Sequence, residues 1–130
     1  MPHKHVYARL GSSQIHGIGV FAVRAIKKGI DIFPDIDDKI IWIDASIIRR
    51  LRGEVRGLYE DYCVKIGGKY GAPDSFNKIN ASWYLNHSSN PNAVVNHKYR
   101  VIAKRGIKKG EEITLDYKTF MDMKIPRGWK

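Results

Sequence analysis

Residues 86–92 (NHSSNPN) form a run in which every side chain except that of proline carries a hydrogen-bonding group. Apolar residues flank the run on both sides, at 83–85 (WYL) and 93–95 (AVV), so we expect it to be buried rather than to form a surface loop. Buried polar groups require partners. An amino-acid-like ligand, with an amine and a carboxylate, would supply some of them, and the run therefore predicts a binding site for such a ligand.

A second feature is the pattern Gly17-x-Gly19-x-x-Ala22, which matches the dinucleotide-binding fingerprint. That fingerprint needs a helix to begin within the glycines, whereas residues 20–23 (VFAV) predict a strand. Glycines between strands instead allow the backbone to approach a ligand without a Cβ in the way. The pattern predicts either a ligand-lining segment or an ordinary turn.

Together with residues 110–117 (GEEITLDY), these two segments resemble, in order, the signatures of SET-domain protein lysine methyltransferases. The resemblance runs from about residue 7 to residue 117. It implies a mostly β, SET-domain (β-clip) fold of several small curved sheets with short helices and a C-terminal, knot-like crossing. It also implies S-adenosylmethionine as cofactor, S-adenosylhomocysteine as product, and a lysine of a protein as the methyl acceptor.

The resemblance implies a role for individual residues as well. Gly17, Ile18 and Gly19 would line the methionine part of the cofactor, Asn86 would contact its amine or carboxylate, and the backbone of His87 would meet the adenine edge. The other residues expected to bind the cofactor are aromatic: Tyr62, Trp83, Tyr84, Tyr117 and Trp129.

Tyr117 is the predicted catalytic residue. Methyl transfer from a sulfonium to an amine is an in-line displacement, so the enzyme mainly aligns the partners and delivers the amine unprotonated. The phenol is expected to form an aromatic wall whose hydroxyl orients the amine. Whether it also takes the proton stays open, because a phenol with a pKa of about 10 is a poor base at neutral pH. Tyr62 is similar to a second active-site tyrosine of small viral SET proteins, and its alternative role is a core position on a helix.

Length and composition predict one compact domain. The resemblance implies that it is a single SET domain over residues 1–130, without a zinc-binding segment after the catalytic tyrosine, and we expect no metal site. No apolar run approaches the roughly 20 residues that cross a bilayer, so we expect no membrane partner. We expect an intracellular, cytoplasmic protein, or one in the host nucleus if it is viral or an effector, either monomer or homodimer. The net charge of +10 leaves nucleic acid or an acidic protein as a secondary partner.

Residues 20–32 and 101–113 are similar at a constant offset, and each predicts a hairpin-like unit with a Lys-Lys-Gly turn. Duplication and convergent turn chemistry both explain the likeness. Residues 44–62 predict a helix, broken near Gly53 or Gly57, and residues 65–80 predict a loop.

The acidic residues within 31–38 (DIFPDIDD) predict either a solvated loop or a rim that selects a basic peptide tail. The predicted function is S-adenosylmethionine-dependent methylation of a protein lysine. The alternative is a non-catalytic SET-fold module that docks nucleic acid or an acidic partner on its basic surface.

Overall fold

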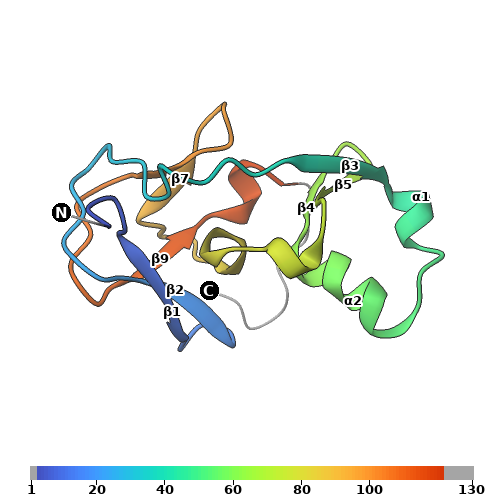
Figure 1. The fold of residues 1–130 in the computed structure, drawn as a ribbon, viewed down its shortest axis with the longest axis horizontal. Coiled ribbons are helices and arrows are strands. Elements are labelled where there is room, and N and C mark those ends of the chain that lie inside the picture. The colour runs from blue at the N-terminus through green and yellow to red at the C-terminus, as the bar shows by residue number, and fades with distance from the viewer. Residues whose placement is uncertain (1–2, 122–130) are drawn as a thin grey trace.

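The computed structural model describes residues 3–121, which form three small sheets joined by short helices (Figure 1). The four-stranded sheet has the order β1 (Ala8–Ser12), β2 (Ile18–Ala22), β9 (Glu112–Leu115), β6 (Asn86–His87). The three-stranded sheet has the order β3 (Ile40–Asp44), β5 (Lys69–Pro73), β4 (Val64–Ile66). The third sheet pairs β7 (Ala93–Val95) with β8 (Val101–Ala103). The mostly β class predicted from the sequence is confirmed.

The helices are short. They are α1 (Ala45–Ile48), α2 (Gly53–Tyr62) and the 3-10 helices η1 (Phe76–Lys78), η2 (Ala81–Tyr84) and η3 (Tyr117–Thr119). In Figure 1, α1 and α2 lie beside the three-stranded sheet at one end of the molecule, and β1, β2 and β9 lie toward the other end. Among residues 3–121, no helix has the length and apolar character needed to cross a membrane.

The two similar segments pair with each other instead of folding into separate hairpins. β2 pairs with β9, with Val20 opposite Ile113. Ile26 and Ile107 exchange two backbone hydrogen bonds of 2.8 Å. The predicted hairpin-like units are therefore wrong in their pairing, because each run finds its partner strand in the other segment.

The contacts between the segments repeat at an offset of 81 residues, the separation of Val20 from Val101. Gly29 donates its N–H to the Ala103 carbonyl at 2.8 Å, and Gly110 donates to the Ala22 carbonyl at the same distance. Both glycines have a left-handed backbone, with φ values of 91° and 86°, which suits a residue without a Cβ. The two segments are thus related by an approximate two-fold axis, which favours duplication over convergent turn chemistry.

The hydrophobic core lies between these two segments and the chain around residue 85. Its buried members are Val20, Ala22, Ile26, Ile32, Leu85, Ala93, Ala103, Ile107, Ile113 and Leu115. Tyr84 and Tyr117 pack against this cluster at its border. Burial of such side chains contributes about 1.5–3 kcal/mol for each large residue, so the core fixes the strands from which the signature residues project.

The helical and loop predictions for the middle of the chain need correction. The helix breaks before Gly53, which has a φ of 64°, but Gly57 lies inside α2. The predicted loop at 65–80 instead contains β5, most of β4 and the 3-10 helix η1. Gly67 and Gly68, with φ values of 59° and 75°, form the tight turn between these strands, as expected for a two-residue hairpin loop of the primed type.

The acidic segment is held in place by Arg100. This side chain donates to Asp31 Oδ2 at 2.9 Å and to the carbonyls of Ile36 and Phe33 at 2.6 and 2.7 Å. Asp31 is therefore part of the framework. Asp35 and Asp37 are exposed.

Candidate active site

Parallel pairing of β6 with β9 brings two of the signature segments together. Asn86 lies opposite Thr114, and His87 lies opposite Leu115. Ser88 donates its N–H to the Leu115 carbonyl at 2.9 Å. These contacts are the ones expected if the C-terminal segment crosses beside residues 86–92.

The buried Asn86 side chain connects three distant parts of the chain. Its Nδ2 lies 3.0 Å from the His16 carbonyl oxygen and 3.2 Å from that of Ile18, both in the glycine segment. The same nitrogen lies 3.1 Å from Ser13 Oγ and 3.0 Å from Glu112 Oε2. Ser13 Oγ in turn donates to Glu112, at 2.8 and 2.9 Å from its two carboxylate oxygens. Asn86, Ser13 and Glu112 thus form one hydrogen-bonded group, which we call the Asn86 cluster.

Gly19 is required by its close approach to this cluster. A Cβ at residue 19 would lie 2.4 Å from Glu112 Oε2, closer than real contacts allow, and 3.0 Å from Ser13 Cβ, which is tighter than most real contacts. Gly17 has a φ of 46°, and a Cβ there would meet no atom within 4 Å. The first glycine is needed for the turn itself and the second for packing against Glu112.

The chemistry of the Asn86 cluster fits the amino-acid end of S-adenosylmethionine. The Asn86 amide has two N–H groups and faces four acceptors, so the cluster retains accepting capacity. An α-ammonium group brings three N–H donors. Gly17 and Ile18 are exposed, so the carbonyl edge beside Asn86 is accessible from solvent. β6 is the last strand of its sheet, and such a strand offers unpaired backbone groups at its outer side.

His87 is 2% exposed and acts as a hydrogen-bond acceptor. Its Nδ1 accepts the backbone N–H of Tyr117 at 3.1 Å, which requires an imidazole without a proton on that nitrogen. Burial lowers the pKa of His87, and the nearby Asp116 carboxylate opposes this shift only in part. The side chain is therefore a neutral support for Tyr117.

The Tyr117 side chain is mostly enclosed. Its hydroxyl donates to the backbone carbonyl of Leu85, and its ring contacts those of His87 and Phe120 at centroid distances of 5.3 and 6.0 Å. Burial, together with the negative charge of Glu112, raises the pKa of the phenol well above its usual value. The phenol is thus protonated at neutral pH and is held beside the segment that carries Asn86.

Tyr62 and Tyr84 lie together at a second aromatic group. Their rings meet edge to face at 5.3 Å, and Tyr62 also contacts Phe76 at 6.5 Å. Burial and the neighbouring Tyr84 raise the pKa of Tyr62. Tyr84 borders the same core as Tyr117. The cofactor-binding role of both tyrosines stays a prediction.

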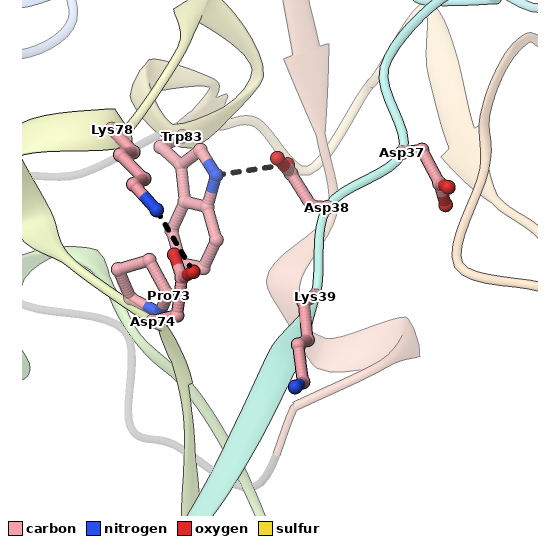
Figure 2. A pocket seen from close by; sticks show the side chains of 7 residues that line it. All are labelled: Asp37, Asp38, Lys39, Pro73, Asp74, Lys78 and Trp83. Atoms are coloured by element: carbon pink, nitrogen blue, oxygen red, sulfur yellow. Dashed lines mark hydrogen bonds and ion pairs between the residues drawn. The ribbon is translucent and has the colours of Figure 1, made fainter.

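Trp83 lines a cleft with three aspartates and two lysines, which we call the acidic cleft (Figure 2). Its Nε1 donates to Asp38 Oδ2 at 3.0 Å, and Asn80 donates to the same carboxylate at 3.0 and 3.1 Å. Lys78 and Asp74, which also line the cleft, form an ion pair of 3.2 Å. The cavity measures about 190 Å³, and its remaining walls are Asp37, Lys39 and Pro73. The indole therefore faces the cleft, and a contact of Trp83 with the cofactor stays a prediction.

The sequence did not single out three residues that organise the site. Ser13 and Glu112 hold Asn86, as described above. Asn92, 2% exposed, donates to Glu111 and to the Glu112 carbonyl and accepts the Thr114 N–H at 2.9 Å. The available signal was the second glutamate of the GEE segment and the last asparagine of NHSSNPN. Trp129 lies outside the described residues.

Within residues 3–121, no group of three or more His, Cys, Asp or Glu side chains has the arrangement of a metal site. Cys63 is buried, and burial raises the pKa of its thiol to about 12. The structure assigns this cysteine to packing.

The model of the SET domain family matches residues 17–118. The chain is 32% identical to the histone-lysine N-methyltransferase trithorax of Drosophila virilis, over 92% of this chain and 3% of that protein. It is 36% identical to the histone-lysine N-methyltransferase trr of Drosophila melanogaster, over 84% and 5%. It is also 32% identical to the H3 lysine-4 specific histone-lysine N-methyltransferase of Schizosaccharomyces pombe, over 83% and 12%. The chain thus spans a small part of the length of these relatives.

Solved structures show the same fold. One is Chaetomium thermophilum Polycomb Repressive Complex 2 bound to GSK126, with a TM-score of 0.62, 24% identity, and coverage of 89% of this chain and 16% of that one. Another, ctPRC2 in an autoinhibited conformation bound to S-adenosylmethionine, has a TM-score of 0.61 at 22% identity, covering 91% and 16%. The chain belongs to the SET domain family, whose domain carries protein-lysine methyltransferase activity with S-adenosylmethionine as cofactor.

Proposed function

We propose that this chain transfers a methyl group from S-adenosylmethionine to the amine of a lysine in a protein substrate. The observation that carries the proposal is the placement of the Tyr117 hydroxyl on the Leu85 carbonyl, immediately before Asn86. This contact joins the predicted catalytic phenol to the segment that holds the acceptor-rich Asn86 cluster.

The Asn86 cluster, the carbonyls of His16 and Ile18 and the outer edge of β6 would hold the cofactor. When bound, S-adenosylmethionine would supply a methyl group on a positively charged sulfur. The residues of this chain bind and orient the reactants, which is the main requirement of an in-line displacement.

Tyr117 orients the lysine amine and leaves its proton to solvent. Its hydroxyl hydrogen is committed to Leu85, so the phenol oxygen offers its lone pairs to an N–H of the incoming amine. Because burial and the Glu112 charge raise the pKa of the phenol, a phenolate base is not available near neutral pH. The aromatic wall also disfavours the ammonium form of lysine by desolvation.

The substrate that best suits the surface is a lysine within a basic tail. Three carboxylates and two ammonium groups line the cleft beside Trp83, and Asp74 pairs with Lys78, so the cleft keeps a small excess of negative charge. The chain as a whole has a charge of +10. Local negative charge offsets the repulsion of a basic peptide. Trp83 precedes Leu85 by two residues, so this cleft adjoins the segment that positions Tyr117.

The test combines binding and turnover. Calorimetry on the wild type should show one S-adenosylhomocysteine bound per chain, and labelled S-adenosylmethionine should methylate a protein in a lysate of the source organism. Tyr117→Phe should retain cofactor binding while methylation falls on the order of a hundredfold. Tyr99→Phe, at a tyrosine that is 57% exposed, is the matched control.

Full methylation by Tyr117→Phe would contradict the assigned role. Cofactor binding without methylation of any protein by the wild type would favour the alternative, a non-catalytic module that docks nucleic acid or an acidic partner. The basic-tail proposal has its own test. Asp38→Asn should raise the KM for a lysine-containing basic peptide more at low salt than at high salt, and an unchanged KM at low salt would refute it.

A further inference from the structure

The Glu112 carboxylate is surrounded by neutral donors. It accepts from the Ser13 hydroxyl and lies 3.0 Å from the Asn86 amide nitrogen. Within residues 3–121, no lysine, arginine or histidine nitrogen lies within ion-pair distance of it. The residue is half-buried, so its negative charge is only partly screened by water.

Other acidic side chains at the junction of the two repeated segments do have cationic partners. Glu111, the preceding residue, pairs with Arg105 at 2.9 Å. Asp31, which is related to Glu112 by the offset of 81 residues, pairs with Arg100 at 2.9 Å. Of these three carboxylates at the junction, Glu112 is the one without an ion pair to a described residue.

The repeat also shows which residue stands where Glu112 would otherwise have a cationic partner. Asp31 bridges to Ile102 and Glu112 pairs with Phe21, so the two carboxylates occupy equivalent places across the approximate two-fold axis. The residue equivalent to Arg100 is Gly19. Where one half of the fold has a guanidinium against its carboxylate, the other half has a glycine whose absent Cβ makes room for Glu112.

The negative charge of Glu112 affects neighbouring groups of the candidate site. The Glu112 charge contributes to the raised pKa of Tyr117, so its field reaches the phenol. Asn86 lies between this carboxylate and the exposed glycine segment. A positively charged ligand in this site would thus be attracted by a carboxylate that forms no ion pair with a described residue.

We propose that Glu112 makes the site selective for the charge of its ligand, so that it favours the cationic S-adenosylmethionine over the neutral product S-adenosylhomocysteine. This inference rests on the proposed function. The methyl donor carries a sulfonium, an ammonium and a carboxylate, and loss of the methyl group turns the sulfonium into a neutral thioether. Its net charge therefore falls from positive to zero, and the attraction to Glu112 weakens, which promotes release of the product.

The experiment compares two ligands that share the adenosyl and amino-acid groups and differ in charge. Sinefungin carries an ammonium in place of the methylsulfonium, whereas S-adenosylhomocysteine is neutral at that position. Dissociation constants for both are measured by calorimetry for the wild type and for Glu112→Gln. Glutamine has nearly the same shape and retains hydrogen-bonding groups for Ser13 and Asn86.

Glu112→Gln should weaken sinefungin about fivefold more than S-adenosylhomocysteine, the size expected for one partly hydrated charge pair. Glu111→Gln is the matched control, because it removes a neighbouring carboxylate that does not touch Asn86. It should leave the ratio of the two dissociation constants unchanged. A second variant, Ser13→Lys, places an ammonium against Glu112 and should also abolish the preference.

If Glu112→Gln weakens both ligands equally, or neither, the residue has only a structural role and the inference fails. A thermal melt of each variant verifies that it is folded. If the folded wild type binds neither ligand, the proposed function itself fails, which is a distinguishable result.

Discussion

Gly19→Ala should destabilise the fold through the Asn86 cluster. The added methyl carbon would lie 2.4 Å from Glu112 Oε2 and 2.9 Å from Glu112 Cδ. The carboxylate must therefore move away and give up its contacts with Ser13, at 2.8 and 2.9 Å, and with Asn86, at 3.0 Å. At about 1 kcal/mol for each hydrogen bond lost, and with water replacing part of them, the free energy of unfolding should fall by about 2–3 kcal/mol.

Urea denaturation measures this change, and two further variants make it specific. Gly57→Ala is the matched control, because Gly57 lies inside α2 and a Cβ there meets no atom within 4 Å. It should raise the free energy of unfolding by up to about 1 kcal/mol. In a Glu112→Ala background, Gly19→Ala should cost less than about 1 kcal/mol, because the clash is removed. An equal cost in both backgrounds would refute the reasoning.

Three further predictions concern other parts of the fold. Burial lowers the pKa of His87 from 6.5, so its contribution to stability is complete above about pH 6.5 and declines as the pH falls toward the lowered value. His87→Gln should therefore reduce the acid sensitivity of the unfolding free energy, and an unchanged pH profile would contradict this. The exposed His97→Gln is the control. Because burial raises the thiol pKa of Cys63 to about 12, a disulfide reagent at pH 8 should modify it only after denaturation; rapid labelling of the folded protein would show otherwise. Arg100→Ala should lower the free energy of unfolding by about 2–4 kcal/mol, because it leaves Asp31 unpaired. The dissociation constant of S-adenosylhomocysteine should stay unchanged. A weakened affinity would contradict this, because it would show that the Arg100 half of the fold affects the Asn86 cluster.

The sequence predicted the strands and turns of the repeated segments but not their pairing. Each segment has an apolar run, a Lys-Lys-Gly turn and a second apolar run. This pattern is the same whether the two runs pair with each other or with the runs of the other segment. The choice depends on burial of Ile26 against Ile107, which are far apart in the chain. Local patterns carry no information on such contacts.

The hairpin of β4 and β5 was missed although its turn was visible in the sequence. Gly67-Gly68 lies between Val64–Ile66 and Lys69–Pro73, and a Gly-Gly pair between short strands indicates a primed turn. The nearby Gly71, Pro73 and polar residues are typical of a loop and mask this signal. Helix α2 was easier to predict, because its apolar positions recur at helical spacing over ten residues.

The candidate site was predictable for residues that belong to a signature segment. It was not predictable for residues whose role depends on contacts between distant segments. Asn86 and Tyr117 follow from the resemblance to SET domains. The bond between Ser13 and Glu112 joins residues 99 positions apart, and Ser13 belongs to no signature segment. Its role arises only when β1, β2 and β9 lie side by side in one sheet.

The repeated frame explains why the site has formed on one side only. Both halves place a carboxylate at the same point of the strand exchange, at Asp31 and at Glu112. With Arg100 beside it, Asp31 is neutralised and its half anchors the segment that leads to the acidic cleft. With Gly19 at the equivalent position, Glu112 has no arginine beside it and approaches Asn86. One pair of equivalent positions therefore distinguishes the half that anchors the acidic segment from the half in which we propose the ligand site.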